Sequence, residues 1–154
     1  MELIYYPSPL LKSVSEPIVT INEDIKTLIS NLTELMISNR GVGISAIQAG
    51  YNCRLFLIYV NKKVKVFINP EIVAFSNVKV ALEEGCLSIP NTNAKVSRPH
   101  VVVVKALNEH GKEFAIQADK MEARVIQHEL DHLNGVLYFE RIPDLNLDRF
   151  FKDY

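Results

Sequence analysis

Apolar side chains recur every three or four positions in the first quarter of the chain, which is the spacing of an amphipathic helix. They are Ile21, Ile25, Leu28, Ile29, Leu32, Leu35 and Met36. Asn39 and Arg40 follow, and then Gly41, which suits the left-handed position after a helix. The pattern predicts a helix over 21–39 that Gly41 ends.

Four short apolar segments are typical of strands. Arg54–Val60 and Val64–Ile68 are joined across residues 61–63, and we expect Pro70 to end the second strand because proline lacks an N–H donor. Val101–Leu107 and Glu113–Ala118 form a second predicted hairpin, which turns through residues 108–111. These segments predict antiparallel pairing.

A second helix is predicted after the last strand. Asp119, with Glu122 three positions later, is typical of a capping box, and Gly135 ends the pattern. One stripe along this helix falls at i, i+4, i+7 and i+11, and its members are Met121, Val125, His128 and His132. The stripe that buries the helix therefore continues into two histidines. We predict an α+β fold, with mostly antiparallel strands packed around this central helix.

The two histidines belong to the segment His128-Glu129-Leu130-Asp131-His132, which can hold a metal ion. Residues four apart lie about 40° from each other around the axis of an α-helix, so both imidazoles can reach one ion. Glu129 lies about 60° from His132 on the same projection. A glutamate there can act as the base of a metal-dependent hydrolase, and the alternative is a solvated surface charge.

A tetrahedral catalytic ion takes three protein ligands and leaves one position for water or substrate. Cys86 is the candidate for the third ligand. In an extended segment alternate residues face the same side, so Cys86 can point at the helix while Gly85 and Leu87 point elsewhere. A thiolate with two imidazoles is a known catalytic ligand set. The alternative for Cys86 is a small buried apolar residue, which is also our interpretation of Cys53.

Composition narrows the function classes. The chain has 154 residues, of which 48% are hydrophobic, and this fits a single catalytic domain over 1–154. Seventeen basic and eighteen acidic side chains give a net charge of −1, so nothing favours binding to nucleic acid or an anionic membrane. We find no segment typical of a membrane span or a secretory signal, and only two cysteines. These features predict a cytoplasmic protein.

Three segments, taken in order, resemble the motifs of the peptide deformylases. Gly41-Val42-Gly43-Ile44-Ser45-Ala46-Ile47-Gln48 is similar to the glycine-rich first motif of that family, which ends in glutamine. Glu84-Gly85-Cys86-Leu87-Ser88 matches its cysteine motif, and Gln127-His128-Glu129-Leu130-Asp131-His132 matches its helical motif. A lone Gly-x-Gly is weak evidence, and His-Glu-x-x-His alone fits many metallopeptidases. The three motifs together are specific.

The resemblance implies a metal-dependent hydrolase that removes the formyl group from the N-terminal formylmethionine of newly made polypeptides and releases formate. It makes Cys86, His128 and His132 the ligands of one divalent ion. That ion is usually ferrous iron in the family, and zinc, nickel or cobalt can replace it. Glu129 becomes the acid/base. The Gln48 side chain and the Leu87 backbone N–H become donors to the oxyanion, a role worth about 3 kcal/mol per donor.

The resemblance also implies a site for a formylmethionyl peptide. The loop with Gly41 and Gly43 lets an extended substrate backbone approach, although such glycines also simply turn a chain. The positions that match the methionine pocket are Val42, Leu82, Met121 and Val125. The alternative for these four apolar side chains is ordinary core packing. We also expect a structural ion pair between Glu84 and Arg98, and no role for His100 or His110.

The sequence departs from the family pattern at three places. Ser45 stands where most members have alanine, and it adds a hydroxyl beside the site. Asn93 stands where several members have an arginine that holds substrate backbone, so affinity beyond the first residue is expected to differ. The chain ends about ten residues after Pro143, whereas many bacterial members continue into a C-terminal helix associated with ribosome docking. A ribosome contact is therefore expected to be weakened.

Two other functions remain open from the sequence. A zinc endopeptidase also uses His-Glu-x-x-His, but it normally takes its third ligand from a downstream His or Glu. A metal- or peptide-binding protein without catalysis needs neither Glu129 nor Gln48. Formate release measured beside casein proteolysis separates the three possibilities.

Overall fold

A computed structural model describes residues 1–152 and residue 154. In this part of the chain five strands form one antiparallel sheet in the order β1-β2-β3-β6-β7, and two more form a separate antiparallel pair. The first sheet contains β1 (Gly43–Ser45), β2 (Leu55–Val60), β3 (Lys63–Phe75), β6 (Val101–Leu107) and β7 (Glu113–Asp119). The pair contains β4 (Lys79–Cys86) and β5 (Ile89–Pro99), and the α-helices are α1 (Glu23–Ser38), α2 (Lys120–Leu133) and α3 (Leu147–Phe150). The predicted α+β class is confirmed.

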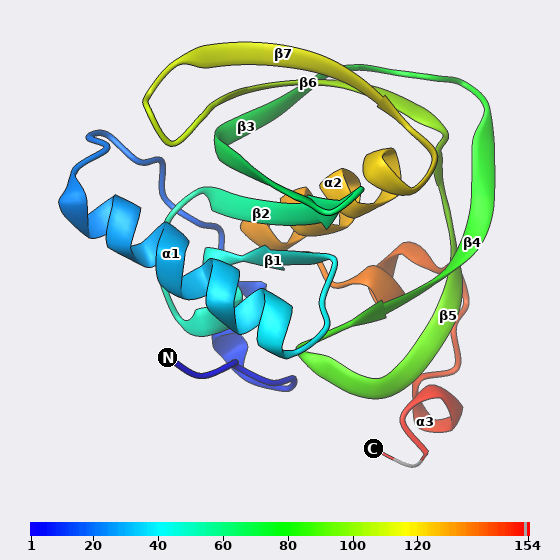
Figure 1. Cartoon of the computed structure of the whole chain (residues 1–154). Coiled ribbons are helices and arrows are strands. Elements are labelled where there is room, and N and C mark those ends of the chain that lie inside the picture. Colours follow the sequence, from blue (N-terminus) through cyan, green and yellow to red (C-terminus); the bar gives the residue numbers. More distant parts are fainter. Residues whose placement is uncertain (153) are drawn as a thin grey trace.

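Strand β2 separates two hydrophobic cores because its side chains alternate between the two faces of the sheet. Leu55 and Leu57 point into one core, which also holds Leu32 of α1. Phe56 and Ile58 point into the other, which holds the apolar face of α2. All four β2 side chains are fully buried. The two helices therefore cover opposite faces of one sheet, and Figure 1 shows α2 running through the middle of the molecule.

Strand β3 is longer than the sequence indicated, since it continues past Pro70 to Phe75. The expectation that Pro70 ends the strand is wrong because a bulge lies there. The pairing of β3 with β6 shifts register between Ile68 and Glu71, and Asn69 adopts a φ of 50°. The Asn69 side chain bonds the backbone N–H and C=O of Ile18, at 2.8 Å each. Proline is tolerated at such a bulge, where no ladder donor is needed.

The helix ends differ from the prediction in two details. Arg40, with a φ of 57°, takes the left-handed position after α1 that was expected for Gly41. Asp119 makes no side-chain hydrogen bond at the start of α2, so the predicted capping box is wrong. The Glu122 carboxylate instead pairs with Lys65 at 2.7 Å. Gly135 does follow α2 with a φ of 73°, as predicted.

The β4–β5 hairpin lies beside α2 (Figure 1), and Cys86 at the end of β4 contacts His132 of that helix. The sequence indicated only an extended segment around Cys86, and the full hairpin was not predicted. The two ends of the chain meet near this hairpin, where the Tyr6 ring stacks on Phe151 at 4.9 Å between centroids. No described helix is both long enough and apolar enough to cross a membrane.

Candidate active site and metal centre

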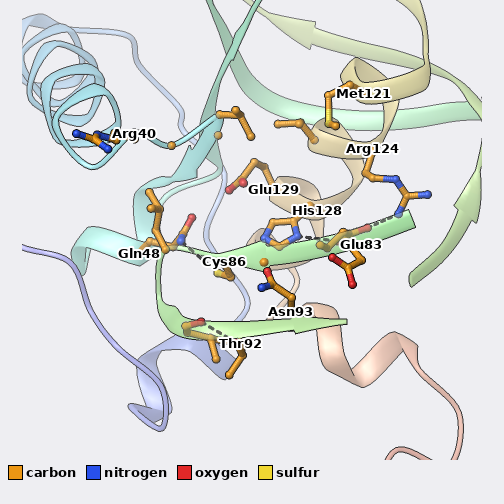
Figure 2. Close-up of a pocket in the computed structure, with 18 of the residues that line it drawn as sticks. Arg40, Gln48, Glu83, Cys86, Thr92, Asn93, Met121, Arg124, His128 and Glu129 are labelled. Atoms are coloured by element: carbon orange, nitrogen blue, oxygen red, sulfur yellow. Dashed lines mark hydrogen bonds and ion pairs between the residues drawn. The ribbon is translucent and has the colours of Figure 1, made fainter. Parts of the chain in front are cut away.

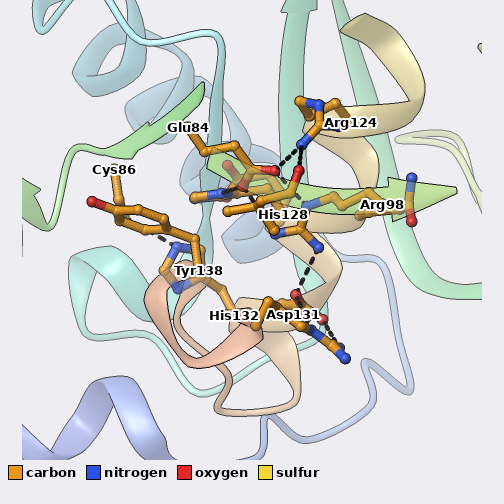
Figure 3. A network of polar contacts seen from close by, with 12 residues as sticks. Glu84, Cys86, Arg98, Arg124, His128, Asp131, His132 and Tyr138 are labelled. Carbon is orange, nitrogen blue, oxygen red and sulfur yellow. Dashed lines mark hydrogen bonds and ion pairs between the residues drawn. The ribbon is translucent and has the colours of Figure 1, made fainter. Parts of the chain in front are cut away.

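Three potential metal ligands lie together where β4 meets α2 (Figure 3). Cys86 is the last residue of β4, while His128 and His132 lie one helical turn apart on α2. One ligand atom from each residue lies within 4.8 Å of the other two. The Cys86 Sγ and His132 Nε2 atoms are 3.3 Å apart. The sequence therefore indicated the three residues that the fold brings together.

The three side chains fit a tetrahedral divalent ion. Bond lengths of about 2.3 Å to sulfur and about 2.0 Å to nitrogen put two such ligand atoms roughly 3.5 Å apart. The observed 3.3 Å between Cys86 and His132 is close to that spacing. The other ring nitrogen of His132, Nδ1, is buried without a hydrogen-bond partner among the described residues. His132 is thus held at this site by its position on α2 and by its contact with Cys86.

His128 is oriented by a buried carboxylate. Its Nδ1 lies 2.9 Å from Glu84 Oε1, so Nε2 is left to face the ligand cluster. Arg98 donates to both oxygens of Glu84, and Arg124 donates to Glu84 Oε2 (Figure 3). The expected ion pair between Glu84 and Arg98 is confirmed, and it forms one part of a larger network. A carboxylate that orients a metal-binding imidazole is a frequent outer-shell arrangement.

The network continues to the end of α2. Arg98 donates to Asp131 at 3.0 Å, and Arg141 donates to both oxygens of the same carboxylate. The side chain of Asp131 is 8% exposed, so its charge is compensated inside the protein. Asp131 is part of the helical motif, but no role was predicted for it. In the structure, Asp131 connects the metal-binding turn of α2 to Arg141 in the segment after the helix.

The network changes the protonation of its members. Burial raises the pKa of Glu84, but hydrogen bonds from His128 and Arg98 outweigh it and lower the pKa to about 2. Burial lowers the pKa of His128, but its bonds to Cys86 and Glu84 outweigh that and raise it to about 10. Burial, with the charges of His128 and Arg98, holds the pKa of His132 well below its ordinary value. A metal ion at Nε2 of His128 therefore has to displace a proton.

Glu129 is buried beside the ligands, and only 4% of its surface is exposed. The hydroxyl of Ser45 on β1 lies 2.9 Å from Glu129 Oε1. Burial raises the pKa of Glu129 to about 7, although the charge of His128 and the Ser45 hydrogen bond oppose the shift. A carboxyl group poised near neutral pH suits an acid/base catalyst.

Gln48 faces the same site from the 3₁₀ turn after β1. The Ser45 backbone N–H donates to Gln48 Oε1 at 2.9 Å, which fixes the amide. The Gln48 NH₂ group then points toward Ser88 Oγ at 3.1 Å and Cys86 Sγ at 3.7 Å. Leu87 lies between Cys86 and Ser88 in the turn that joins β4 to β5. The fold therefore brings a side-chain amide and this turn to the same edge of the ligand cluster.

A cavity of about 430 Å³ opens onto these groups (Figure 2). Gln48, Cys86, His128 and Glu129 all line it. Of the four positions that matched the methionine pocket, Val42, Met121 and Val125 line the cavity, and Gly43 lines it as well. Leu82 does not line it, because its side chain borders a smaller cavity that shares Met121. Val125 is buried, whereas Val42 and Met121 are about half exposed.

The site requires a glycine at position 43, because it has no room for a side chain there. A Cβ atom there would lie 2.7 Å from Glu129 Oε2 and 2.8 Å from a methyl group of Val125. Both distances are too short for a side chain, so any residue larger than glycine would displace the carboxylate. Glycine at this position therefore lets β1 pack closely against Glu129 and Val125 of α2.

Some residues of the cavity were not indicated by the sequence. Arg124 binds Glu84 and also donates to the backbone oxygens of Val96 and Val80, at 2.9 and 2.7 Å. Its position four residues before His128, on the inward face of α2, was a signal for such a role. Arg40 also lines the cavity, from a segment that carries no local signal of this, and so does Asn93, one of the positions where the sequence departs from the family pattern.

The site combines a cysteine and two histidines around one point with a buried glutamate beside them. This combination defines the class of protein as a metal-dependent hydrolase. Comparisons with known proteins identify the family. The family described as Polypeptide deformylase matches residues 1–148. The peptide deformylase of Treponema pallidum (strain Nichols) is 43% identical over 154 residues, which cover 100% of this chain and 95% of the relative. The peptide deformylase of Borreliella burgdorferi is 38% identical over 156 residues, covering 100% and 94%.

Solved structures agree with the sequence comparison. The crystal structure of a Synechococcus elongatus peptide deformylase in complex with actinonin superimposes with a TM-score of 0.95 and 34% identity, covering 99% of this chain and 84% of that one. The Thermotoga maritima peptide deformylase gives a TM-score of 0.90 and 35% identity, covering 92% and 96%. The chain belongs to the polypeptide deformylase family. The family is metal-dependent, in accord with the cluster of Cys86, His128 and His132.

Proposed function

We propose that this enzyme removes the N-formyl group from the N-terminal formylmethionine of newly made polypeptides and releases formate, with the residues of the cavity in the roles that follow. One observation carries the proposal. Cys86, His128 and His132 converge on one point, and both Glu129 and Gln48 reach the same cavity. A site built only to bind metal has no need of the last two groups.

Cys86, His128 and His132 would hold one divalent ion, and ferrous iron is the ion we propose. Zinc, nickel and cobalt are expected to substitute, because thiolate and imidazole suit all four ions. The ion, when bound, supplies Lewis-acid activation of a water molecule near neutral pH. Glu84 keeps the His128 ring in place through Nδ1. Cys86 and His128 line the cavity, so an ion that they hold would lie at its wall.

Glu129 would act as the acid/base. Its carboxylate takes a proton from the attacking water, and the resulting hydroxide adds to the formyl carbon. The same carboxyl then delivers the proton to the amine as the carbon–nitrogen bond breaks, so Glu129 ends each cycle as it began. Glu129 is buried and lines the cavity, so its carboxyl is placed to accept and release a proton there.

Gln48 and Leu87 would stabilise the oxyanion that forms on the formyl oxygen. The Gln48 amide is fixed by the Ser45 backbone N–H, so its NH₂ group is already oriented before substrate binds. The backbone N–H of Leu87 is the second donor we propose. Preorganised donors of this kind act on charge that appears only in the transition state.

The formylmethionyl peptide would lie in the cavity beside Gly43, as an extended strand along the loop that carries this glycine. Val42, Met121 and Val125 would contact the methionine side chain. Leu82 would contact the methionine side chain from the smaller cavity, which shares Met121 with the larger one. Exposure of about half of Met121 supports a side chain that is covered when substrate binds.

The remaining assignments concern the whole chain. We propose that residues 1–154 form a single catalytic domain, which the family match over residues 1–148 supports. We place the enzyme in the cytoplasm, where nascent chains carry formylmethionine.

The experiment compares formate release from formyl-Met-Ala-Ser with casein proteolysis, using the metal-loaded protein and the Glu129→Gln variant. We expect formate release without proteolysis. The Glu129→Gln variant should keep its metal, because Glu129 is not a ligand, while its turnover falls about 10²- to 10⁴-fold. Proteolysis would support an endopeptidase, and metal binding without either activity would support a binding protein. Near wild-type turnover of the variant would remove Glu129 from the mechanism.

A further inference from the structure

Ser45 contacts both of the proposed catalytic side chains. Its hydroxyl oxygen lies 2.9 Å from Glu129 Oε1 and 2.9 Å from the Glu129 backbone oxygen. Its backbone N–H donates to Gln48 Oε1 at 2.9 Å. The residue is fully buried on β1, so no bulk water competes for these bonds.

The two oxygens of the Glu129 carboxylate have different surroundings. Oε1 accepts the Ser45 hydroxyl. Oε2 has no hydrogen-bond donor among the described residues and faces Gly43, which lines the cavity. The same carboxylate therefore has one oxygen held by Ser45 and one oxygen that faces Gly43 at the cavity.

We propose that Ser45 is a positioning residue that makes Oε2 the oxygen through which Glu129 takes and gives its proton. This rests on the proposed acid/base role of Glu129. A carboxylate oxygen is a stronger acceptor than an amide oxygen, so the single hydroxyl proton goes to Oε1 in preference to the backbone oxygen. After Oε2 has taken a proton, Oε1 is a carbonyl-type oxygen and still accepts the same bond.

The Ser45 hydroxyl therefore has an acceptor at Oε1 in both states of the cycle. It also holds the carboxyl plane, because rotation about the last side-chain bond would break the bond to Oε1. This matters because a terminal carboxyl torsion is broad and weakly held when nothing contacts it. A proton donor or acceptor must lie within hydrogen-bond reach of its target, so a fixed Oε2 position raises turnover.

The two contacts of Ser45 can be separated by mutation. Replacing Ser45 with alanine removes the hydroxyl, while the backbone N–H that fixes Gln48 stays. Ser15 provides a matched control, since its hydroxyl is also buried but has no hydrogen-bond partner among the described residues. Ser15→Ala removes the same atom from a place where it bonds nothing.

The experiment measures kcat and KM for formyl-Met-Ala-Ser, metal content and unfolding temperature. The metal-loaded proteins are the wild type, Ser45→Ala, Glu129→Gln, the double variant and Ser15→Ala. We expect Ser45→Ala to lower kcat about tenfold, or about 1.4 kcal/mol of transition-state free energy, with KM and metal content unchanged. In the Glu129→Gln background the same change should alter kcat less than about twofold, because its target is gone. Ser15→Ala should match the wild type.

Three results would overturn the role of Ser45. These are a kcat for Ser45→Ala within twofold of wild type, an equal fall in both backgrounds, or a fall that accompanies loss of metal. Failure of the proposed function looks different. A wild-type protein that releases no formate, or a Glu129→Gln variant with full turnover, would overturn the acid/base role of Glu129 and the role of Ser45 with it.

Discussion

The carboxylate of Glu84 meets three side chains that carry or can carry positive charge, namely Arg98, Arg124 and His128. The side chains of these four residues are at most 10% exposed. Removing one charge from such a cluster leaves the others buried and unpaired, which typically costs 3–5 kcal/mol. The cluster therefore destabilises the folded protein when one of its charges is missing. Its value to the enzyme is the fixed orientation of His128.

Glu84 should make the free energy of unfolding depend on pH in the acid range. Its pKa is lowered from 4.5 to about 2 in the folded protein, so its contribution is fully present above pH 4.5 and is lost as the pH falls through 2. The shift corresponds to roughly 3 kcal/mol. Urea unfolding of wild type and Glu84→Gln between pH 7 and pH 2 measures it. The wild type should be more stable at pH 7, and the difference should shrink toward pH 2. A constant difference would contradict the linkage.

The metal ligands give a second prediction for single residues. Cys86→Ala, His128→Ala and His132→Ala should each lose most of the bound ion, because two remaining ligands bind far more weakly than three. Elemental analysis of the purified proteins measures this. Cys53→Ala is the control, since Cys53 packs in the core on the α1 side of the sheet, away from the ligand cluster. Full occupancy in any of the three variants would show that its side chain is not a ligand.

Among the elements, those with a regular pattern were predictable. The 3.6-residue spacing located α1 and α2, and the apolar segments located β2, β6 and β7. The end of β3 was not predictable, because the bulge at Asn69 depends on a pairing with Ile18, far away in the chain. The missing cap at α2 has the same cause, since Glu122 is held by Lys65 from another strand. Local rules fail where a distant residue takes the side chain they rely on.

The site divides in the same way. Cys86, His128, Glu129 and His132 lie in compact motifs whose spacing reflects their chemistry, so the sequence indicated them. Arg124 and Asp131 act through partners on other elements, and only the folded structure reveals those partners. Residue type alone could not show that these charges are buried. The outer contacts of the site are therefore its least predictable part.

The turn after α2 gives a prediction about how elements join. Gly135 and Gly50 both have positive φ, at 73° and 86°. A Cβ on Gly135 would lie 2.4 Å from the backbone oxygen of Lys12, whereas the nearest atom to one on Gly50 is 3.7 Å away. Gly50→Ala should therefore cost only the backbone strain, about 1 kcal/mol, and Gly135→Ala at least twice that. Thermal unfolding of both variants measures the difference. Equal costs would mean that the chain near Lys12 moves freely.

On the scale of the whole molecule, the active site is a meeting point of separate layers. Ser45 and Gln48 come from the edge of the five-stranded sheet, Cys86 comes from the β4–β5 hairpin, and the histidines come from α2. No single layer contains the complete set. The geometry of the site therefore depends on how the hairpin docks against the helix and the sheet.

The ion would then act as a cross-link as well as a catalyst. Cys86 and His128 are separated by a long stretch of chain that includes β5, β6 and β7, so a bond through the metal would tie the β4–β5 hairpin to α2 in the folded protein. A ligand that binds only the folded state adds about 2.7 kcal/mol of stability when it is present at a hundred times its Kd. A chelator should therefore lower the unfolding temperature of the wild type. The Cys86→Ala variant, which lacks one end of the cross-link, should unfold at the same temperature with or without the chelator.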